Sequence, residues 1–417
     1  MNVGIVGLGY VGLPLAVSFC EAGHNVIGVD VDPRKIRALQ GAVSYIEDVP
    51  SETLEAISDR LSPSLRFAEL SRCDAVIVAV PTPLTRNREP DLGPLVAATT
   101  AISAVLQRGQ LIVLESTTYP GTTRERLVPL LEESGLAAGV DFNVAFSPER
   151  IDPGRTDYTM SNTPKVVGGL TDACLERAAA LYGEICGEVV RVSTPEVAEL
   201  TKLLENIFRS VNIALVNELA QLCDRMGVDV WEVVDAAATK PFGFMSFKPG
   251  PGLGGHCLPV DPFYLSWKAR QYDFYTEFIE LAGKINENMP YFCLEKVTRA
   301  LNSHEKAIKG SKILLVGVSY KADVGDLRES PALKLVELLR EQGGDVAYHD
   351  PHVPELREHG LVSTDLDGAL EAADCVAVVT AHSGIDYGRL AERSRLLVDF
   401  RNATGRNGTA NGRVWKL

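Results

Sequence analysis

The chain has 417 residues, 46% of them apolar and 23% charged, so it is long enough for two or three domains and has the composition of a soluble globular protein. A formal net charge of −14 argues against nucleic acid or an anionic membrane as a partner, because both would repel it. The eight cysteines are scattered without a CxxC pair, and the opening lacks the basic region of a signal peptide, which predicts reduced thiols in the cytoplasm. Glycines and a proline interrupt the apolar opening, so it is not expected to span a membrane.

The amino-terminal segment contains a dinucleotide-binding fingerprint. A strand is predicted over residues 2–6, Gly7-Leu8-Gly9-Tyr10-Val11-Gly12 follows at once, and a second strand over residues 25–30 ends in Asp30. Gly7 permits the turn, Gly9 lets a pyrophosphate approach the backbone, and Gly12 lets the next helix pack on the strand. Asp30 is expected to accept hydrogen bonds from the adenosine ribose, which favours NAD over NADP. The cofactor-binding candidates of the whole chain are Gly7, Gly9, Tyr10, Val11, Gly12, Asp30, Lys35, Thr82, Thr117 and Arg328.

Further apolar runs predict strands that alternate with helical or turn-rich stretches, over residues 75–80, 111–115, 143–146, 165–168 and 189–192. This alternation is typical of a parallel sheet with helices on both faces, in which ligands lie beyond the carboxyl ends of the strands. Thr117 and Glu149 follow two of those ends and are functional candidates, whereas the prolines and serines around them are explained by turn chemistry.

One long helix is predicted over residues 195–225, with Thr194 as N-cap and Pro195 as the first helical residue. Lys202 and Asn206 are four residues apart, so they project from the same face, either as functional groups or as solvated surface. The apolar stripe of this helix is broad, which predicts burial on more than one side and hence a homodimer in which the helix meets its copy. The alternative is that the small helices of residues 226–299 cover the stripe within one chain.

Residues 250–262 are rich in glycine and proline, so they are predicted to form a loop. Cys257 lies in this loop with little side-chain bulk around it, and Asp261 follows four residues later. Such a thiol is a candidate nucleophile, and the alternative is a buried structural cysteine. No metal is expected, since His256 and Cys257 are adjacent and the sequence has no second ligand pair at zinc-like spacing.

Strands predicted over residues 312–318, 345–349, 375–380 and 396–400 indicate a second Rossmann-like domain, without GxGxxG and therefore with a different ligand. Its basic candidates are Lys321, Arg328 and Arg401. The predicted fold class is α/β, with two Rossmann-like doubly wound domains joined by a long central helix and a helical dimerisation region. The predicted boundaries are 1–194 for the NAD-binding domain, 195–300 for the central helix and the cysteine loop, and 301–417 for the second Rossmann-like domain.

Four motifs, in order and spacing, resemble those of the UDP-glucose/GDP-mannose dehydrogenase family over the whole chain. They are residues 7–12 with Asp30, Glu115-Ser116-Thr117, Glu199-Leu200-Thr201-Lys202 with Asn206, and Gly254-Gly255-His256-Cys257 with Asp261. The resemblance implies two NAD-dependent oxidations that turn the C6 alcohol of a nucleotide sugar into a carboxylate, for cell-surface polysaccharide biosynthesis. It also implies a homodimer built through the central helical region and a UDP-sugar-binding domain at residues 301–417.

The resemblance implies a role for each candidate catalytic residue. Cys257 would capture the aldehyde as a thiohemiacetal that becomes a thioester, while Lys202 and Asn206 would stabilise oxyanions. Asp261 and Glu149 would orient or activate water, with support from Thr117. The substrate-binding candidates are Glu149, Arg150, Lys202, Asn206, Gly254, Lys321 and Arg401.

The form Gly-Gly-His-Cys-Leu-Pro-Val-Asp-Pro is most similar to the branch that oxidises UDP-N-acetylhexosamines, which favours UDP-N-acetylglucosamine or UDP-N-acetylmannosamine over UDP-glucose or TDP-glucose. Residues 239–244 depart from the UDP-glucose pattern, in which an arginine of a neighbouring subunit reaches the sugar, and Lys240 and Lys248 are the candidates to replace it. Two alternatives remain: a two-electron hydroxyacid or sugar-acid dehydrogenase in which Cys257 is structural, and a catalytically silent nucleotide-sugar-binding protein.

Overall fold

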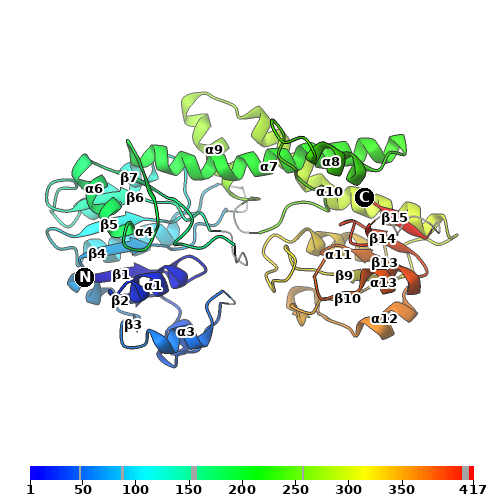
Figure 1. Cartoon of the computed structure of the whole chain (residues 1–417), viewed down its shortest axis with the longest axis horizontal. Helices are drawn as coiled ribbons and strands as arrows, with labels where there is room; N and C mark the ends of the chain where they lie inside the picture. Colours follow the sequence, from blue (N-terminus) through cyan, green and yellow to red (C-terminus); the bar gives the residue numbers. More distant parts are fainter. Residues whose placement is uncertain (47, 86–88, 152–156, 256–257, 406–412) are drawn as a thin grey trace. The chain divides into compact units, whose positions relative to one another are not determined.

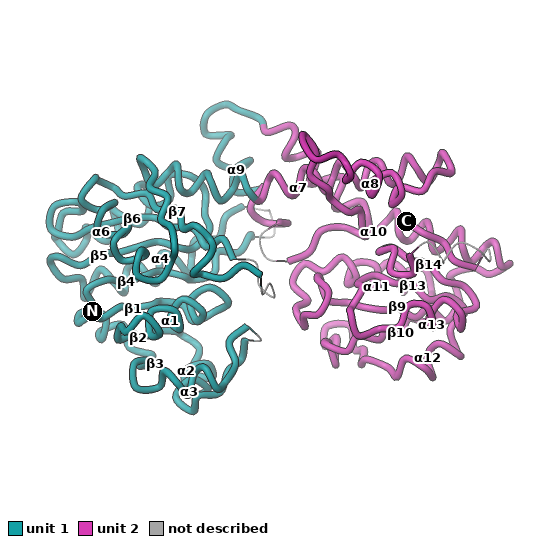
Figure 2. Tube along the Cα trace, viewed as in Figure 1, with its two compact units in different colours: residues 1–205, 263–275 teal, residues 206–262, 276–417 magenta. Residues whose placement is uncertain are grey.

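The computed structural model describes residues 1–46, 48–85, 89–151, 157–255, 258–405 and 413–417 (Figure 1). The chain divides into two compact units, one of residues 1–205 and 263–275 and the other of residues 206–262 and 276–417 (Figure 2). Each unit is built around its own sheet. Among the described helices, none combines the length and the apolar character that a membrane span requires.

The first unit contains an eight-stranded sheet in the order β3-β2-β1-β4-β5-β6-β7-β8. The strands are β1 (Asn2–Val6), β2 (Asn25–Val29), β3 (Leu61–Ser64), β4 (Ala75–Val78), β5 (Leu111–Leu114), β6 (Asn143–Phe146), β7 (Lys165–Gly169) and β8 (Val189–Val192). All neighbours are parallel except β6 and β7, which are antiparallel. The expectation of a wholly parallel sheet is therefore wrong at this pair. A parallel connection needs a crossover, usually a helix, and the described residues between β6 and β7 form no helix.

Helices bury both faces of this sheet, as a doubly wound fold requires. Leu13 and Phe19 of α1 pack in one apolar cluster, and Leu95 and Ile102 of α4 pack in the other. The helices of this part of the chain are α1 (Gly12–Glu21), α2 (Pro33–Gln40), α3 (Ser51–Ala56), α4 (Gly93–Ser103), α5 (Val128–Glu132) and α6 (Asp172–Tyr182), with the short turns η1 (Phe67–Arg72) and η2 (Thr123–Leu127).

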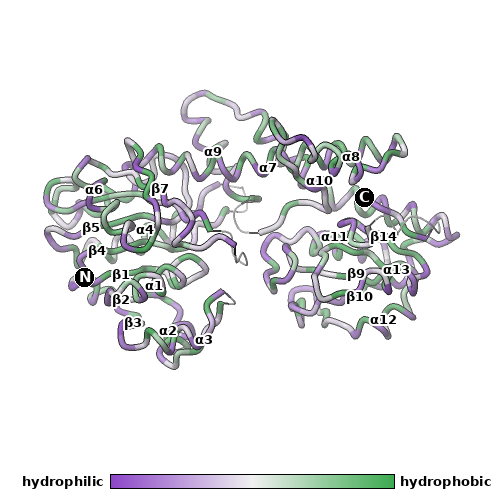
Figure 3. Tube along the Cα trace, in the orientation of Figure 1, coloured by the Kyte–Doolittle hydropathy of each residue, from purple (hydrophilic) through white to green (hydrophobic). Residues whose placement is uncertain are grey.

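A single helix, α7 (Pro195–Met226), matches the long helix that the sequence predicts, and it alternates hydrophobic and hydrophilic residues along its length (Figure 3). Thr194 caps it, because its hydroxyl accepts a hydrogen bond from the amide of Val197 at 3.3 Å. The next elements are α8 (Val230–Ala238), α9 (Asp261–Ala269), η3 (Arg270–Tyr272) and α10 (Glu277–Asn302). One side of α7 is buried and another exposes large apolar side chains, namely Val197, Leu200, Leu204, Phe208, Leu215, Leu219, Leu222 and Met226.

The second unit contains a five-stranded parallel sheet in the order β10-β9-β13-β14-β15. Its strands are β9 (Lys312–Val316), β10 (Asp345–His349), β13 (Cys375–Val378), β14 (Leu397–Asp399) and β15 (Val414–Lys416), with a small hairpin of β11 (Glu355–Leu356) and β12 (Leu361–Val362) joined by η4 (Arg357–His359). The helices α11 (Pro331–Glu341), α12 (Leu366–Ala372) and α13 (Tyr387–Arg393) complete it. Leu335 of α11 belongs to the apolar cluster on one face, and Leu370 of α12 and Leu390 of α13 belong to the other. The predicted α/β class with two doubly wound sheets and a long helix is confirmed.

Candidate active site

The glycine turn after β1 has the geometry of a pyrophosphate cradle. Gly7 has φ +94°, which favours glycine, and its amide donates to the carbonyl of Val29 at 2.8 Å. A Cβ on Gly12 would lie 1.8 Å from the carbonyl oxygen of Gly7, so helix and turn could not pack with any larger residue. A Cβ on Gly9 would meet no protein atom within 4 Å. The fold itself does not need Gly9, and the space beside it fits a phosphate group at the start of α1.

Asp30 lies at the end of β2, next to this turn, and is 7% exposed. Its carboxylate accepts hydrogen bonds from the amides of Leu8 and Asp32, both at 2.9 Å. The ammonium of Lys35 lies 3.0 Å from the same carboxylate. Tyr10, by contrast, is exposed at the start of α1, and Val11 is half-buried. These residues are arranged as a dinucleotide site requires, so the residues present fit NAD.

Thr82 and Thr117, which follow β4 and β5, are in direct contact. The Thr82 hydroxyl donates to the Thr117 carbonyl at 2.7 Å. The Tyr264 hydroxyl donates in turn to the Thr82 carbonyl. The two loops are therefore fixed to each other at the carboxyl edge of the sheet, where the sequence places both threonines.

Glu149 is part of a buried ionic network that the sequence did not reveal. The ammonium of Lys165 lies 3.2 Å from Glu149 and 3.1 Å from Glu115. The Tyr182 hydroxyl donates to the same Glu115 oxygen. The other oxygen of Glu149 accepts from the amides of Arg150 at 2.8 Å and Ile151 at 2.6 Å. Glu115 directly follows β5 and Lys165 begins β7. No local pattern in the sequence predicts that these two residues are in contact.

The charges of this network set its protonation. Burial opposes ionisation of Glu149, but the charge of Lys165, the amide of Ile151 and the charge of Lys202 outweigh it, so the pKa of Glu149 lies below its ordinary value. Burial raises the pKa of Glu115, although Lys165 acts against it. Burial also acts to lower the pKa of Lys165, but the two carboxylates outweigh it and hold that pKa above its ordinary value. Lys165 and Glu149 therefore form a charged pair.

Arg150, a substrate-binding candidate, is held by protein groups. Its guanidinium donates to the carbonyl of Pro164 at 2.6 Å and lies 2.7 Å from the carboxylate of Glu205. Its side chain keeps 27% exposure, so contact with a ligand is still open to it.

On α7, Lys202 is 7% exposed and Asn206 is fully buried, so the possibility that they are solvated surface residues is wrong. The side-chain amide of Asn206 donates to the carboxylate of Asp261, and its oxygen accepts from the guanidinium of Arg209. Asp261 is 2% exposed. Because both ends of the amide have partners, the direction in which Asn206 presents its N–H groups is fixed.

The glycine loop contacts both α7 and loops of the second sheet. The Gly250 amide donates to the side-chain oxygen of Asn217 at 2.9 Å, and a Cβ on Gly250 would lie 2.4 Å from the guanidinium of Arg401. Gly255 has φ +90°, its amide donates to the carbonyl of Arg328 at 2.9 Å, and its Cβ position is 2.9 Å from the ring of Tyr320. Close packing thus explains why this loop is rich in glycine. His256 and Cys257 lie outside the described residues.

Three basic candidates of the second unit lie around this loop. Arg401 donates from Nε to the carbonyl of Val379 at 2.8 Å, which ties its guanidinium to the residue after β13. Lys321 directly follows Tyr320, against which Gly254 packs. The guanidinium of Arg328 is bound by Asp326 at 2.9 Å. Arg401 thus lies against Gly250 at the start of the loop, and Gly254 lies against Tyr320, the residue before Lys321.

The seven cysteines that the structure describes are free thiols, and all but Cys223 are buried. Burial raises the pKa of Cys20, Cys73 and Cys375 to about 12. Thiols of that kind stay protonated at neutral pH and are poor nucleophiles. These three buried thiols are therefore not candidates for a reactive thiol.

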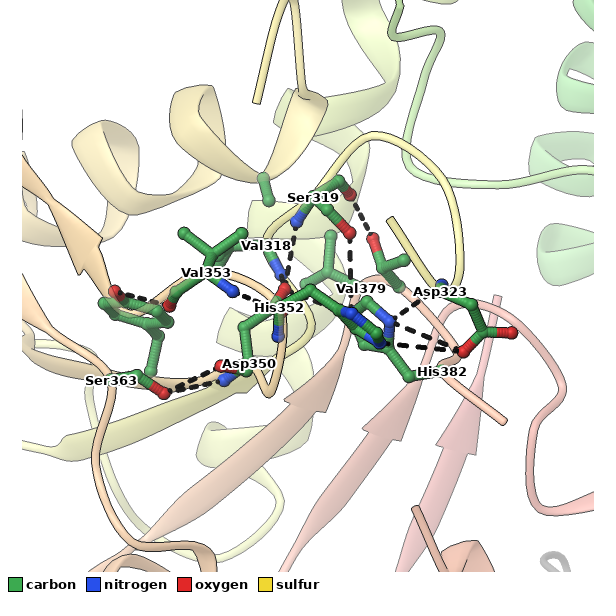
Figure 4. Close-up of polar contacts among 12 residues, drawn as sticks. Val318, Ser319, Asp323, Asp350, His352, Val353, Ser363, Val379 and His382 are labelled. Atoms are coloured by element: carbon green, nitrogen blue, oxygen red, sulfur yellow. Dashed lines mark hydrogen bonds and ion pairs between the residues drawn. The ribbon is translucent and has the colours of Figure 1, made fainter. Parts of the chain in front are cut away.

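The second sheet has a glycine turn and an aspartate in the same places as the first sheet, but its aspartate is not accessible to a dinucleotide. Gly317 after β9 has φ +78°, and Asp350 after β10 accepts from the amide of Val318 at 2.7 Å, as Asp30 does from Leu8 in the first unit. Asp350, however, is 2% exposed and lies 3.0 Å from Nε2 of the fully buried His382 (Figure 4). Its oxygens are therefore not available to a ribose. This is a physical reason for the second domain to bind a different ligand.

The imidazole of His382 also lies near Asp323 and His352, and these three form the one group in the described residues whose ligand atoms are close enough for a metal. Nδ1 of His382 faces the amide of Asp323 at 3.0 Å, so this nitrogen is the acceptor and Nε2 carries the proton toward Asp350. Both ring nitrogens of His382 are engaged, and the imidazole fixes the loop after β9 instead of offering a metal ligand.

Comparison with known proteins identifies the family. Three domain models of the UDP-glucose/GDP-mannose dehydrogenase family match the chain: the NAD-binding domain at residues 1–186, the central domain at residues 196–288 and the UDP-binding domain at residues 314–406. The chain is 38% identical over 390 residues to a UDP-N-acetyl-D-glucosamine 6-dehydrogenase of Pseudomonas aeruginosa, covering 92% of this chain and 91% of that protein. The chain therefore belongs to the UDP-glucose/GDP-mannose dehydrogenase family. This confirms the resemblance and the predicted cofactor, NAD.

Solved structures agree with this assignment. The structure of a UDP-D-ManNAc dehydrogenase from Pyrococcus horikoshii has a TM-score of 0.92 at 33% identity, covering 100% of this chain and 99% of that one. The UDP-N-acetyl-mannosamine dehydrogenase Cap5O from Staphylococcus aureus has a TM-score of 0.86 at 30% identity, covering 100% of this chain and 98% of that one.

Proposed function

We propose that this protein oxidises the C6 hydroxyl of a UDP-N-acetylhexosamine to a carboxylate with two equivalents of NAD, for cell-surface polysaccharide biosynthesis. The observation that carries the proposal is the buried contact between Asn206 and Asp261. Burial of an amide and a carboxylate is costly unless they are hydrogen-bonded, and the bond between these two holds the amide in one orientation. A protein that only bound the nucleotide sugar would need neither this pair nor a thiol in the adjoining loop.

In the proposed first oxidation, the C6 alcohol loses a hydride and a proton to give an aldehyde. NAD, held by the glycine turn and Asp30, supplies the hydride acceptor for each oxidation. The Cys257 thiolate then adds to the aldehyde carbon to form a thiohemiacetal, which keeps the aldehyde bound while the cofactor is exchanged. Lys202 and Asn206 stabilise the negative charge on oxygen, an effect worth several kcal/mol for groups held in place beforehand.

In the second oxidation, the thiohemiacetal loses a hydride and a proton to give a thioester. Water then adds to the thioester carbon, and the Cys257 thiolate leaves as the carboxylate forms. Asp261 and Glu149 orient or activate that water, and Thr117 supports it. The ionised state of Glu149, whose pKa burial opposes but Lys165 and other partners keep low, suits an acceptor that orients water.

The second Rossmann-like domain is proposed to hold the UDP-sugar through Gly254, Lys321 and Arg401. The names of the relatives support an N-acetylated sugar, because they include UDP-N-acetyl-D-glucosamine and UDP-N-acetyl-D-mannosamine dehydrogenases. UDP-glucose or TDP-glucose is the alternative substrate. The three-part division at 1–194, 195–300 and 301–417 is proposed on the same basis and is close to the family's domain limits.

We also propose a cytoplasmic homodimer in which α7 meets its copy. The exposed apolar face of α7 supports this, since Leu204 is 64% and Leu215 is 55% exposed. Phe242 is 71% and Met245 is 64% exposed in the segment that also contains Lys240 and Lys248. That segment would reach the partner in the dimer, where either lysine could take the place of the family's cross-subunit arginine.

The test is an assay of NADH formation with a panel of UDP- and TDP-sugars, each at limiting amount. The proposal predicts two NADH per UDP-N-acetylhexosamine and a uronic acid product. One NADH per substrate would favour the two-electron hydroxyacid or sugar-acid dehydrogenase, and binding without NADH would favour a silent binding protein.

A further inference from the structure

The reversal of chain direction between β6 and β7 places an unassigned lysine at the edge of the first sheet where the candidate catalytic residues lie. Lys165 is the first residue of β7, and β7 runs antiparallel to β6. The amino end of β7 therefore lies at the carboxyl ends of β5 and β6, next to Glu115 and Glu149. A parallel β7 would have put Lys165 at the opposite edge.

The three charged groups differ in their access to solvent. The side chains of Lys165 and Glu115 are 2% and 0% exposed, whereas that of Glu149 keeps 13%. A buried ammonium needs compensating charge, and two carboxylates at 3.1 and 3.2 Å provide it. The ammonium also lies 5.2 Å from the centre of the Tyr182 ring. Of these three described side chains, that of Glu149 is the most exposed to solvent.

The hydrogen bonds to both oxygens of Glu149 hold its carboxylate in one orientation. One of its oxygens accepts from the amides of Arg150 and Ile151, and the other faces Lys165. Every one of these partners is a donor, so a proton on Glu149 would oppose at least one of them. An ionised carboxylate can only accept hydrogen bonds, so a water beside it must point a hydrogen toward Glu149 and a lone pair away.

We propose that Lys165 is a positioning residue that keeps Glu149 ionised and in a fixed orientation, so that Glu149 holds the water of the hydrolytic step with a hydrogen toward the carboxylate and a lone pair free to attack; this rests on the proposed function. Glu115 and Tyr182 anchor Lys165 from behind. Without Lys165, Glu115 and Glu149 would share a buried site in which Lys202 acts on Glu149 as the remaining cation, so Glu149 would take up a proton at higher pH. A protonated Glu149 could donate to the water and reverse its orientation.

The first measurement is the pH profile of kcat with a UDP-N-acetylhexosamine. Lys165→Met removes the charge and keeps much of the bulk, and it is expected to move the acid limb upward by roughly 1–3 pH units. The first turnover should still release two NADH per site, because the oxidations precede hydrolysis, and then slow as the thioester accumulates. Lys165→Arg restores a cation and should return the acid limb toward its wild-type position.

A matched control separates positioning from stability. Lys296 belongs to the second unit, where it pairs with Asp224 of the same unit. Its side chain is 6% exposed, so it is buried to a similar degree as Lys165. Lys296→Met removes a comparable buried ion pair without touching Glu149, so it is expected to lower stability but to keep the wild-type acid limb. An acid limb in Lys165→Met that overlays those of wild type and Lys296→Met would overturn the inference.

A second readout needs no turnover. The infrared C=O stretch of protonated carboxyl groups is followed with pH in the unliganded wild-type and Lys165→Met proteins. Adding Glu149→Gln or Glu115→Gln to each protein shows which part of the band belongs to which carboxyl group. The part that Glu149→Gln removes should titrate at higher pH in Lys165→Met than in wild type, and an equal midpoint would contradict the inference. If wild type oxidised no nucleotide sugar, the proposed function would fail, while this titration would still decide the role of Lys165.

Discussion

The side-chain amide of Asn206 donates a hydrogen bond to the carboxylate of Asp261, and both side chains are buried. Asp261 begins α9 directly after the glycine loop, and Asn206 lies on α7, so this contact ties the end of the loop to the long helix. It fixes the amide before any substrate arrives. Electrostatic stabilisation of an oxyanion depends on such prior placement of the donor.

Replacing Asn206 by Ala is expected to lower kcat by roughly 10²–10³-fold, the loss found when one oxyanion donor is removed. NAD affinity should stay at its wild-type value, because the cofactor is held by the first unit. Asn212→Ala is the control, since Asn212 is a half-buried asparagine on the same helix whose amide donates to the carbonyl of Phe208 at 2.7 Å. Equal kcat values for the two variants would remove Asn206 from the mechanism.

Cys257→Ser is expected to abolish steady-state NADH production while NAD binding persists, because a serine hydroxyl without a strong base is a poor nucleophile. Cys223→Ser is the matched control, as Cys223 is the one described cysteine that is not buried. Steady-state kinetics and a binding titration on both variants decide the matter. NADH production by Cys257→Ser at the wild-type rate would exclude covalent capture.

Asp30→Ala is expected to weaken NAD binding by roughly 2–4 kcal/mol, the value of two hydrogen bonds to a charged acceptor. It should also relax discrimination against NADP, because Lys35, now 3.0 Å from Asp30, would lose its partner and could attract a 2′-phosphate. Asp32→Ala is the control, since Asp32 caps α2 by accepting from the amide of Arg34 at 2.8 Å. Calorimetry that gave the same NAD affinity for Asp30→Ala and wild type would refute this role.

Leu204→Lys is expected to convert a dimer into monomers or insoluble protein, because it places a charge in the proposed interface of α7. Activity should fall with it. Val140→Lys is the control, since Val140 is 84% exposed and does not belong to α7. Sedimentation at micromolar concentration provides the measurement, and a homogeneous wild-type species of the chain mass, 45.1 kDa, would rule the dimer out.

Local patterns predicted much of this fold. The glycine turn and Asp30 could be placed because strand, turn, helix and acid follow one another in the chain, and α7 because its apolar positions have a helical period. The strand β3 escaped prediction, since Leu61-Ser62-Pro63-Ser64 has no apolar run, and the short β15 gave an equally weak signal.

Contacts between distant residues could not be predicted. Nothing local indicates that β7 reverses, so the approach of Lys165 to Glu115 and Glu149 follows only from the topology. The spacing of Lys202 and Asn206 put them on one face of a helix, but whether that face is buried depends on what packs there. Asp350 likewise matches Asp30 in position, and only the contact with His382 shows that it is closed to a ligand.

The most direct test of the central claim is the number of NADH molecules formed per molecule of UDP-N-acetylhexosamine consumed, with the product identified by mass spectrometry. The account predicts two NADH and a product in which the C6 hydroxymethyl group has become a carboxylate. One NADH per substrate, with an aldehyde or ketone as the released product, would contradict it.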